Sequence, residues 1–391
     1  MNFQSFFMGG FECADHINRS GIRVNLLKET DHHRQAFYDY QLLKEVGITT
    51  VREGICWSEV EKIPYQYDFT EVKHRILAAN ELGIQQLWDI CHFGYPDGLI
   101  PTHPLFTDRF SELCAAFARF HAEYSNSNLF VVPINEISFL SWHSGDVRGT
   151  VPFAVNSGFD IKYHLCKAAI KGIEALKMVN PNCKIMTIEP LIKIHPNFET
   201  GEIEHVDSYN ANQYQAIDII GGKMCPELEG RLEYLDIIGV NYYYNNQWIH
   251  NGIKLDWPTQ HPQYMDFSQL LIDVKNRYNR PIIISETGHF GDLRSLWLEE
   301  ITYECLEAMQ AGVNLQGLCI YPVLDRPDWD DLTDYCQCGL WDLDENKTRI
   351  PYKPYLNALV ECMESIRKFS SSVSSVYLQR TPITRWDILK L

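Results

Sequence analysis

The chain has 391 residues, of which 45% are hydrophobic and 13% aromatic, so it can bury a large core and is not a disordered protein. Its 34 basic and 51 acidic side chains give a net charge of −17, which argues against nucleic acid or an anionic membrane as the main partner. No apolar run approaches the roughly 20 residues that span a bilayer, and the first ten residues lack the basic start of a signal peptide.

Short apolar runs predict eight β-strands. The run Ile282-Ile283-Ile284 is typical of a strand that is buried on both faces. In chain order the predicted strands are 6–10, 48–53, 84–90, 129–134, 184–188, 235–241, 281–286 and 315–321. Apolar residues at helical spacing, closed in two cases by Gly47 and Gly83, predict helices between the strands. These helices span about 31–46, 69–79, 110–120, 165–176, 208–220, 267–278, 295–310 and 352–369.

This alternation predicts the α/β class and a single-domain (β/α)8 TIM barrel rather than an open sheet. The barrel domain is expected over residues 1–369. The serine-rich stretch Ser370 to Ser375 is expected to be a surface linker to a short C-terminal tail that ends at residue 391.

Two of the predicted strands end in a glutamate. The run 129–134 is followed by Asn135 and Glu136, and the run 281–284 by Ser285 and Glu286. An ionised carboxylate at the end of a buried strand must be paired or hydrogen-bonded. Because catalytic residues of a (β/α)8 barrel lie at the carboxyl ends of its strands, these two glutamates predict a paired-carboxylate site.

Polar and aromatic side chains stand at the other strand ends, as a sugar site requires: hydrogen-bonding groups for hydroxyls and flat apolar faces for the ring. They are Arg52, Asp89, His92, Glu189, Asn241, Tyr243, Tyr321, Asp325, Asp328 and Trp329. Glycoside hydrolysis uses one carboxylic acid and one carboxylate on opposite faces of the sugar. A separation of about 5–5.5 Å between them gives retention of configuration, and about 6.5–9.5 Å gives inversion.

These residues resemble glycoside hydrolase family 1, the β-glucosidase family of the retaining (β/α)8 clan. The similar motifs are Arg52 with Trp57, His92-Phe93, Asn135-Glu136, the segment from Asp236 to Tyr243, and Ile284-Ser285-Glu286-Thr287-Gly288. They follow one another in the order that the family has and span roughly residues 8–343. Each motif is weak alone, and the ordered set is specific.

The resemblance implies a role for each matching residue. Glu136 is the implied general acid/base and Glu286 the implied nucleophile. Arg52 and Tyr243 are implied to contact the nucleophile. The remaining implied contacts are Asn135 to the sugar 2-hydroxyl and His92 to the glycone, the sugar that is transferred. The implied activity is a retaining β-glycosidase, β-glucosidase-like or β-galactosidase-like, that needs no metal and no organic cofactor and acts on a small glycoside or an oligosaccharide.

The sequence also departs from the family pattern. Tyr321 stands where the family has a tryptophan, and Asp328-Trp329 stands where it has Glu-Trp. We expect Tyr321, Asp328 and Trp329 to contact substrate, with a shifted hydroxyl preference because Asp is one methylene shorter. The strand-one glutamine of the family is missing as well, and Glu12, Asp15 and His16 are the candidates to replace it.

Other interpretations remain open. A transglycosidase uses the same intermediate, a non-catalytic glycan-binding barrel keeps only the fold, and a metal-dependent hydrolase would use His16, His92 and acidic residues. Arg52 has the alternative of neutralising Glu53, and Glu189 is expected to be structural. Twelve scattered cysteines favour reduced thiols and a cytoplasmic location. The oligomeric state is left open.

Overall fold

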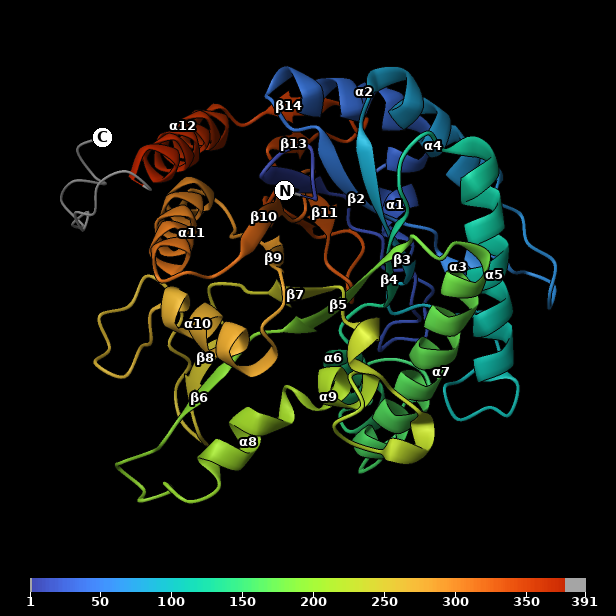
Figure 1. The fold of residues 1–391 in the computed structure, drawn as a ribbon, viewed down its shortest axis with the longest axis horizontal. Helices are drawn as coiled ribbons and strands as arrows, with labels where there is room; N and C mark the ends of the chain where they lie inside the picture. Colours follow the sequence, from blue (N-terminus) through green and yellow to red (C-terminus); the bar gives the residue numbers. More distant parts are fainter. Residues whose placement is uncertain (1, 377–391) are drawn as a thin grey trace.

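The computed structural model describes residues 2–376 of the chain. Its centre is a closed barrel of eight parallel strands in the order β1-β10-β9-β7-β5-β4-β3-β2 (Figure 1). Their bounds are Phe7–Gly10 (β1), Thr50–Gly54 (β2), Gln85–Cys91 (β3), Phe130–Ile134 (β4), Lys184–Pro190 (β5), Ile237–Asn241 (β7), Ile282–Thr287 (β9) and Leu315–Ile320 (β10). The eight predicted strands and the predicted (β/α)8 class are therefore confirmed.

The first and last strands of the barrel close the ring. β1 pairs with β10 through Phe7 and Leu318 and with β2 through Gly9 and Val51. Side chains alternate between the inside and the outside of the ring, as strand geometry requires. The side chains that point into the barrel form an apolar cluster, which includes Met8, Leu87, Phe130, Met186 and Ile283.

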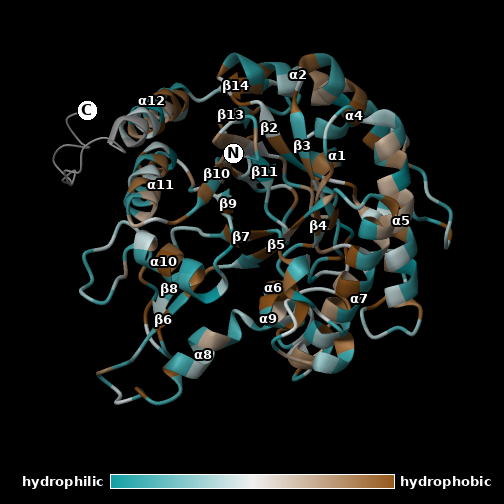
Figure 2. Cartoon of the chain, viewed as in Figure 1, coloured by the Kyte–Doolittle hydropathy of each residue, from teal (hydrophilic) through white to brown (hydrophobic). Residues whose placement is uncertain are grey.

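Helices surround the barrel and bury the outer faces of the strands (Figure 1). Their bounds are Leu26–Glu29 (α1), His32–Glu45 (α2), Trp57–Val60 (α3), Thr70–Leu82 (α4), Phe106–Tyr124 (α5), Ile137–Gly145 (α6), Gly158–Val179 (α7), Val206–Asn212 (α8), Gln215–Ile220 (α9), Phe267–Tyr278 (α10), Leu293–Gln310 (α11) and Lys353–Val376 (α12). Figure 2 shows the apolar residues gathered on the strands and on the helix faces that pack against them. In the described part of the chain, no helix is long and apolar enough to cross a membrane.

Short elements decorate the loops at the carboxyl ends of the strands. Three two-stranded pairs join Lys193–His195 (β6) with Gln247–Ile249 (β8), Arg326–Pro327 (β11) with Tyr335–Cys336 (β12), and Trp341–Leu343 (β13) with Arg349–Pro351 (β14). Two 3₁₀ turns, Pro226–Leu228 (η1) and Leu232–Tyr234 (η2), precede β7. Helix α6 was not predicted, and it begins directly after Glu136.

The C-terminal boundary differs from the expectation. The segment from Ser370 to Ser375 belongs to α12 and is not a linker, and the expected tail lies outside the described residues from 377 onward. The serine hydroxyls explain the continuation. Ser370 and Ser371 donate to the carbonyls of Ile366 and Arg367, one turn back, so they bond along the helix instead of ending it.

Candidate active site

The guanidinium of Arg52 lies at the centre of the candidate site. Arg52 stands on β2, is only 1% exposed, and points into the barrel. Its Nε and Nη2 donate to the two carboxylate oxygens of Asp89 at 3.1 and 2.7 Å. Nη2 also donates to Asn135 Oδ1 at 2.8 Å, and Nη1 donates to the Ser285 carbonyl at 3.0 Å and to Glu286 Oε1 at 2.7 Å. All five N–H donors of the arginine are used, and their partners lie on β3, on β9 and directly after β4, so the guanidinium is held from three sides.

The carboxylate of Glu286 is surrounded by donors. It lies at the end of β9 and is 5% exposed. Besides Arg52 at Oε1, the hydroxyl of Tyr243 donates to Oε2 at 2.7 Å, and Asn135 Nδ2 lies 3.4 Å from Oε1. A carboxylate that accepts charge-assisted hydrogen bonds is stabilised in its ionised form.

Glu136 occupies a contrasting environment. Its backbone takes the left-handed conformation at φ 45°, a state that costs a non-glycine residue about 1–3 kcal/mol and is found at functional sites. The N–H of Glu136 donates to the Ile188 carbonyl at 3.1 Å, and Asn241 Nδ2 donates to its Oε1 at 2.8 Å. Burial raises the pKa of Glu136 well above its usual range, and the negative charge of Glu286 raises it further.

His92 and Asp89 support the arginine from β3 and the loop after it. His92 Nδ1 lies 2.8 Å from Asp89 Oδ2, and Asn135 Nδ2 lies 3.4 Å from His92 Nε2. Burial opposes the charged form of His92, but the hydrogen bond to Asp89 and the negative charges of Asp89, Glu12 and Glu286 together outweigh it and raise the pKa of the imidazole. The pair therefore places a polarised ring edge beside Asn135.

The loop after β1 supplies Glu12 to this site. Tyr321 stacks on His92 with a centroid distance of 5.9 Å, and its hydroxyl donates to Glu12 Oε1 at 3.3 Å. The ring of Tyr321 passes so close to Gly10 that a Cβ there would lie 2.1 Å from it, so this position requires glycine. Of the three candidates to replace the missing glutamine, Glu12 lies beside His92, with its Oε1 3.6 Å from His92 Nε2.

Trp329 forms an aromatic wall with His16 and Phe93. Its ring lies 4.9 Å from His16 and 5.4 Å from Phe93, centroid to centroid. Arg326 lies over the same tryptophan at 5.8 Å, with its Nε 3.5 Å from Glu12 Oε2. Nothing in the sequence marks Arg326, which brings a partly buried cation to this side of the site.

The side chain of Asp328 stabilises the loop in which it lies. One oxygen, Oδ1, accepts hydrogen bonds from the backbone N–H groups of Asp330 and Asp331 at 2.8 and 3.2 Å. The expected contact of Asp328 with substrate therefore rests on its other oxygen alone.

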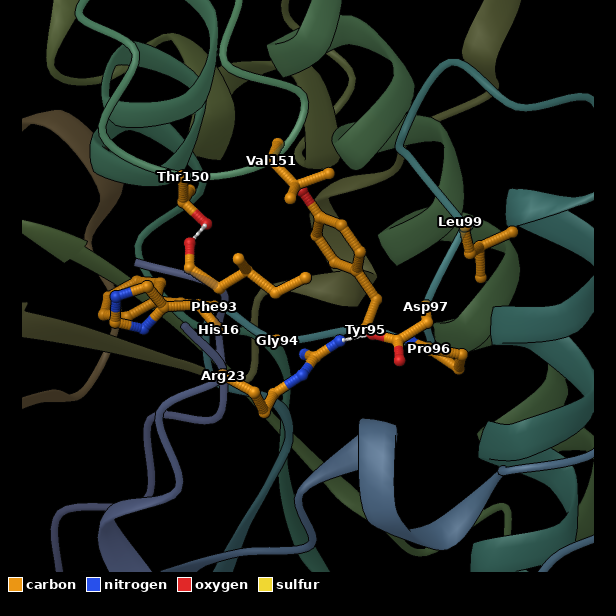
Figure 3. A pocket seen from close by; sticks show the side chains of 12 residues that line it. His16, Arg23, Phe93, Gly94, Tyr95, Pro96, Asp97, Leu99, Thr150 and Val151 are labelled. Atoms are coloured by element: carbon orange, nitrogen blue, oxygen red, sulfur yellow. Dashed lines mark hydrogen bonds and ion pairs between the residues drawn. The ribbon is translucent and has the colours of Figure 1, made fainter. Parts of the chain in front are cut away.

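A cavity of about 50 Å³ lies next to His16, between the loop after β3 and the loop at Thr150 and Val151 (Figure 3). Figure 3 shows the Tyr95 hydroxyl directed at Val151, whose carbonyl accepts its hydrogen bond, and Arg23 paired with Asp97 across the opening. Neither Glu136 nor Glu286 lines this cavity, so it lies to one side of the two carboxyls.

One group of side chains among the described residues has the spacing of metal ligands: Cys13, Asp89 and His92. Both oxygens of Asp89 already accept hydrogen bonds from Arg52, and burial raises the pKa of the Cys13 thiol well above its usual range. A thiol that keeps its proton, beside a guanidinium, is a poor environment for a cation. These residues do not fit a metal ion.

Arg52 does not neutralise Glu53. Glu53 points outward from β2 and is held by His32, Tyr40 and Arg75. His32 is fully buried in that network.

The fold is shared with solved β-glucosidases. Two structures of a β-glucosidase from Thermotoga maritima, in complex with azafagomine and with glucoimidazole, match with TM-scores of 0.70 and 0.71 and 17% sequence identity each. The first match covers 85% of this chain and 87% of that chain, and the second covers 87% and 88%. A scan against protein-family models finds no match, and a search of curated proteins also finds none. At this identity the likeness shows a common (β/α)8 barrel fold.

Proposed function

We propose that this chain is a retaining β-glycosidase in which Glu286 is the nucleophile and Glu136 the general acid/base. The contrast between these two carboxyls carries the proposal. Glu286 accepts hydrogen bonds from a guanidinium and a hydroxyl, which hold its two oxygens in place, whereas Glu136 is buried with one neutral amide donor and a pKa raised by burial. Two carboxyls in such different environments suit a nucleophile and an acid.

In the first step Glu286 attacks the anomeric carbon and Glu136 gives its proton to the departing glycosidic oxygen. Arg52 and Tyr243 hold the attacking carboxylate through separate oxygens, so the nucleophile reaches the sugar in one orientation. Asn135 lies between Glu286 and His92, where it meets the hydroxyl next to the anomeric carbon.

In the second step Glu136 acts as a base toward water. Formation of the glycosyl ester removes the negative charge of Glu286, and that charge is one cause of the raised pKa of Glu136. The pKa of Glu136 therefore falls in the intermediate, and the group that gave a proton can take one from water. Apart from the glycoside and water, the chain's own residues supply every group that these two steps use.

The substrate is a small glycoside or an oligosaccharide. Glu12, His92 and Arg326 offer acceptors and donors to the glycone hydroxyls, and Trp329 and Tyr321 line the same space. All twelve cysteines are free, which supports action in a reducing compartment such as the cytoplasm.

A transglycosidase is the second candidate, supported by an aromatic face on α6. Phe139, Trp142 and His143 share this face, and Phe139 lies 6.2 Å from Trp329, centroid to centroid. Trp142 is 49% exposed on the helix that starts at the acid/base, so a sugar acceptor has a ring on which to stack.

The deciding experiment is incubation with a panel of 2-deoxy-2-fluoro-β-glycosides, followed by intact mass and peptide mapping. We expect a mass increment of one fluoro-sugar on Glu286, absent in Glu286→Gln. Addition of water or of a sugar acceptor to the labelled enzyme then separates hydrolysis from transfer by the product formed. Glycan binding without labelling by any sugar of the panel would favour the non-catalytic barrel instead.

A further inference from the structure

A second buried carboxyl lies next to the proposed acid/base. Glu189 is the penultimate residue of β5 and is 3% exposed. Its neighbours Met186 and Ile188 point into the barrel, so by strand alternation Glu189 faces outward, toward α6 and α7.

The carboxyl of Glu189 receives the start of α6. Its Oε2 and Oε1 accept the backbone N–H of Ser138 at 3.0 and 3.3 Å, two residues after Glu136. The same strand end receives the N–H of Glu136 at the Ile188 carbonyl. β5 therefore holds both sides of the left-handed turn that carries Glu136, and a negative charge at this helix start is stabilised by the helix dipole.

From this geometry we propose that Glu189 is a positioning residue for Glu136: it fixes the first turn of α6, and its negative charge keeps the proton on the Glu136 carboxyl. This inference rests on the proposed function. It assigns a role in the reaction to Glu189, a side chain that the sequence alone predicts to be structural.

The surrounding charges determine the sign of the effect. The groups that face Glu189 are the backbone amides of α6 and two side chains of α7, Lys162 and Cys166. The groups that face Glu136 come from four strands and one loop: Glu286 on β9, Asn241 on β7, Arg52 on β2, Glu189 on β5 and Tyr243 after β7. Burial raises the pKa of Glu189 to about 7, opposed by Ser138 and Lys162. Glu189 thus ionises near neutral pH, and its anion raises the pKa of Glu136.

The test is Glu189→Gln, which keeps an oxygen acceptor for Ser138 and removes the charge. We expect the alkaline limb of the kcat/KM profile to move to lower pH by about half a unit to one unit. Lys162→Met is expected to move it in the same direction, because loss of this cation favours neutral Glu189.

Glu304→Gln is the matched control. Glu304 on α11 is also buried, accepts the N–H of Ser268 in the first turn of α10 at 2.7 Å, and has a pKa raised by burial, but Ser268, Asp266 and Glu300 are the groups that act on it. We expect Glu304→Gln to lose about as much thermal stability as Glu189→Gln and to keep the wild-type pH profile of kcat/KM.

The pKa of Glu136 is also measured without turnover, by ¹³C NMR titration of labelled glutamate carboxyls assigned with Glu136→Gln. A Glu136 pKa that is lowered in Glu189→Gln and unchanged in Glu304→Gln supports the inference even if no glycoside is hydrolysed. An unchanged Glu136 pKa together with an unchanged profile overturns it and leaves Glu189 a structural cap, whereas absence of any fluoro-sugar labelling overturns the proposed function alone.

Discussion

At the scale of single residues, the hydrogen bonds of Arg52 explain why a lysine cannot replace it. A single planar group reaches Asp89, Asn135 and Glu286 at once, each at 2.7 to 3.1 Å. A lysine ammonium is a point donor that cannot span these three partners. The arginine therefore orients the proposed nucleophile and the amide beside it together.

We expect Arg52→Lys to lower kcat on an activated aryl glycoside by about 10²–10³-fold, the magnitude seen when a preorganised donor is lost. Arg75→Lys is the matched control, since Arg75 is equally buried and pairs with Glu53 outside the barrel. Thermal melting of both variants separates folding from catalysis. Equal loss of kcat per folded molecule in the two variants would contradict the assigned role.

Much of the site at this scale follows from sequence, because strand ends of a (β/α)8 barrel converge. Hydrogen bonds join Arg52, Asn135 and Glu286, and the charge of Glu286 acts on Glu136, so the fold brings these predicted residues to one place. The sequence could not reveal Arg326, because its position depends on the short β11–β12 pair, which no apolar periodicity marks. Asn241, at a predicted strand end, has a partner that only the fold reveals.

At the scale of elements, α6 connects the proposed chemistry with the surface. It starts at Glu136, and residues 139, 142 and 143 follow at helical spacing on one face, from the wall at Trp329 to solvent at Trp142. The sequence did not predict α6 because its nine residues, Ile137–Gly145, are apolar on more than one side and give no clear period.

We expect Trp142→Ala to lower kcat/KM about three- to tenfold on β-linked disaccharides, since one aromatic contact contributes about 0.5–1.5 kcal/mol. The same variant should leave kcat/KM unchanged on a glycosyl fluoride, whose leaving group has no ring to stack. Phe198→Ala, at another exposed aromatic side chain, serves as the control. A loss that is equal for both substrates would show that Trp142 supports the fold rather than the leaving group.

On the scale of the whole molecule, the barrel was predictable and its decoration was not. The barrel strands are largely buried runs, rich in β-branched residues in β4, β7 and β9, and such runs can be recognised in a sequence without knowing which strands they pair with. The contacts that join distant parts of the chain cannot be recognised in this way. Asp39 on α2 accepts hydrogen bonds from Arg349 on β14, 310 residues away, and also pairs with His32. That network continues from His32 to Glu53, so it ties both ends of the barrel domain to β2.

This network makes stability depend on pH. Burial disfavours the Glu53 anion, yet His32 and Arg75 lower its pKa from 4.5 to about 2. A lowered pKa in the folded state contributes stability that is present above pH 4.5 and lost as the pH falls toward 2. The same contacts raise the pKa of buried His32, whose contribution is present below its ordinary value of 6.5 and lost as the pH rises through the raised value.

We therefore expect this network to stabilise the fold most between about pH 4.5 and 6.5. Glu53→Gln should remove about 3 kcal/mol of the acid-dependent change in unfolding free energy, since one pKa unit corresponds to about 1.4 kcal/mol. Urea unfolding from pH 2.5 to 7 measures it. Glu364→Gln, at a surface carboxylate paired with Arg367, should keep the wild-type pH dependence because solvent screens that pair. If Glu53→Gln keeps the wild-type slope below pH 4.5, other buried carboxylates carry the acid sensitivity.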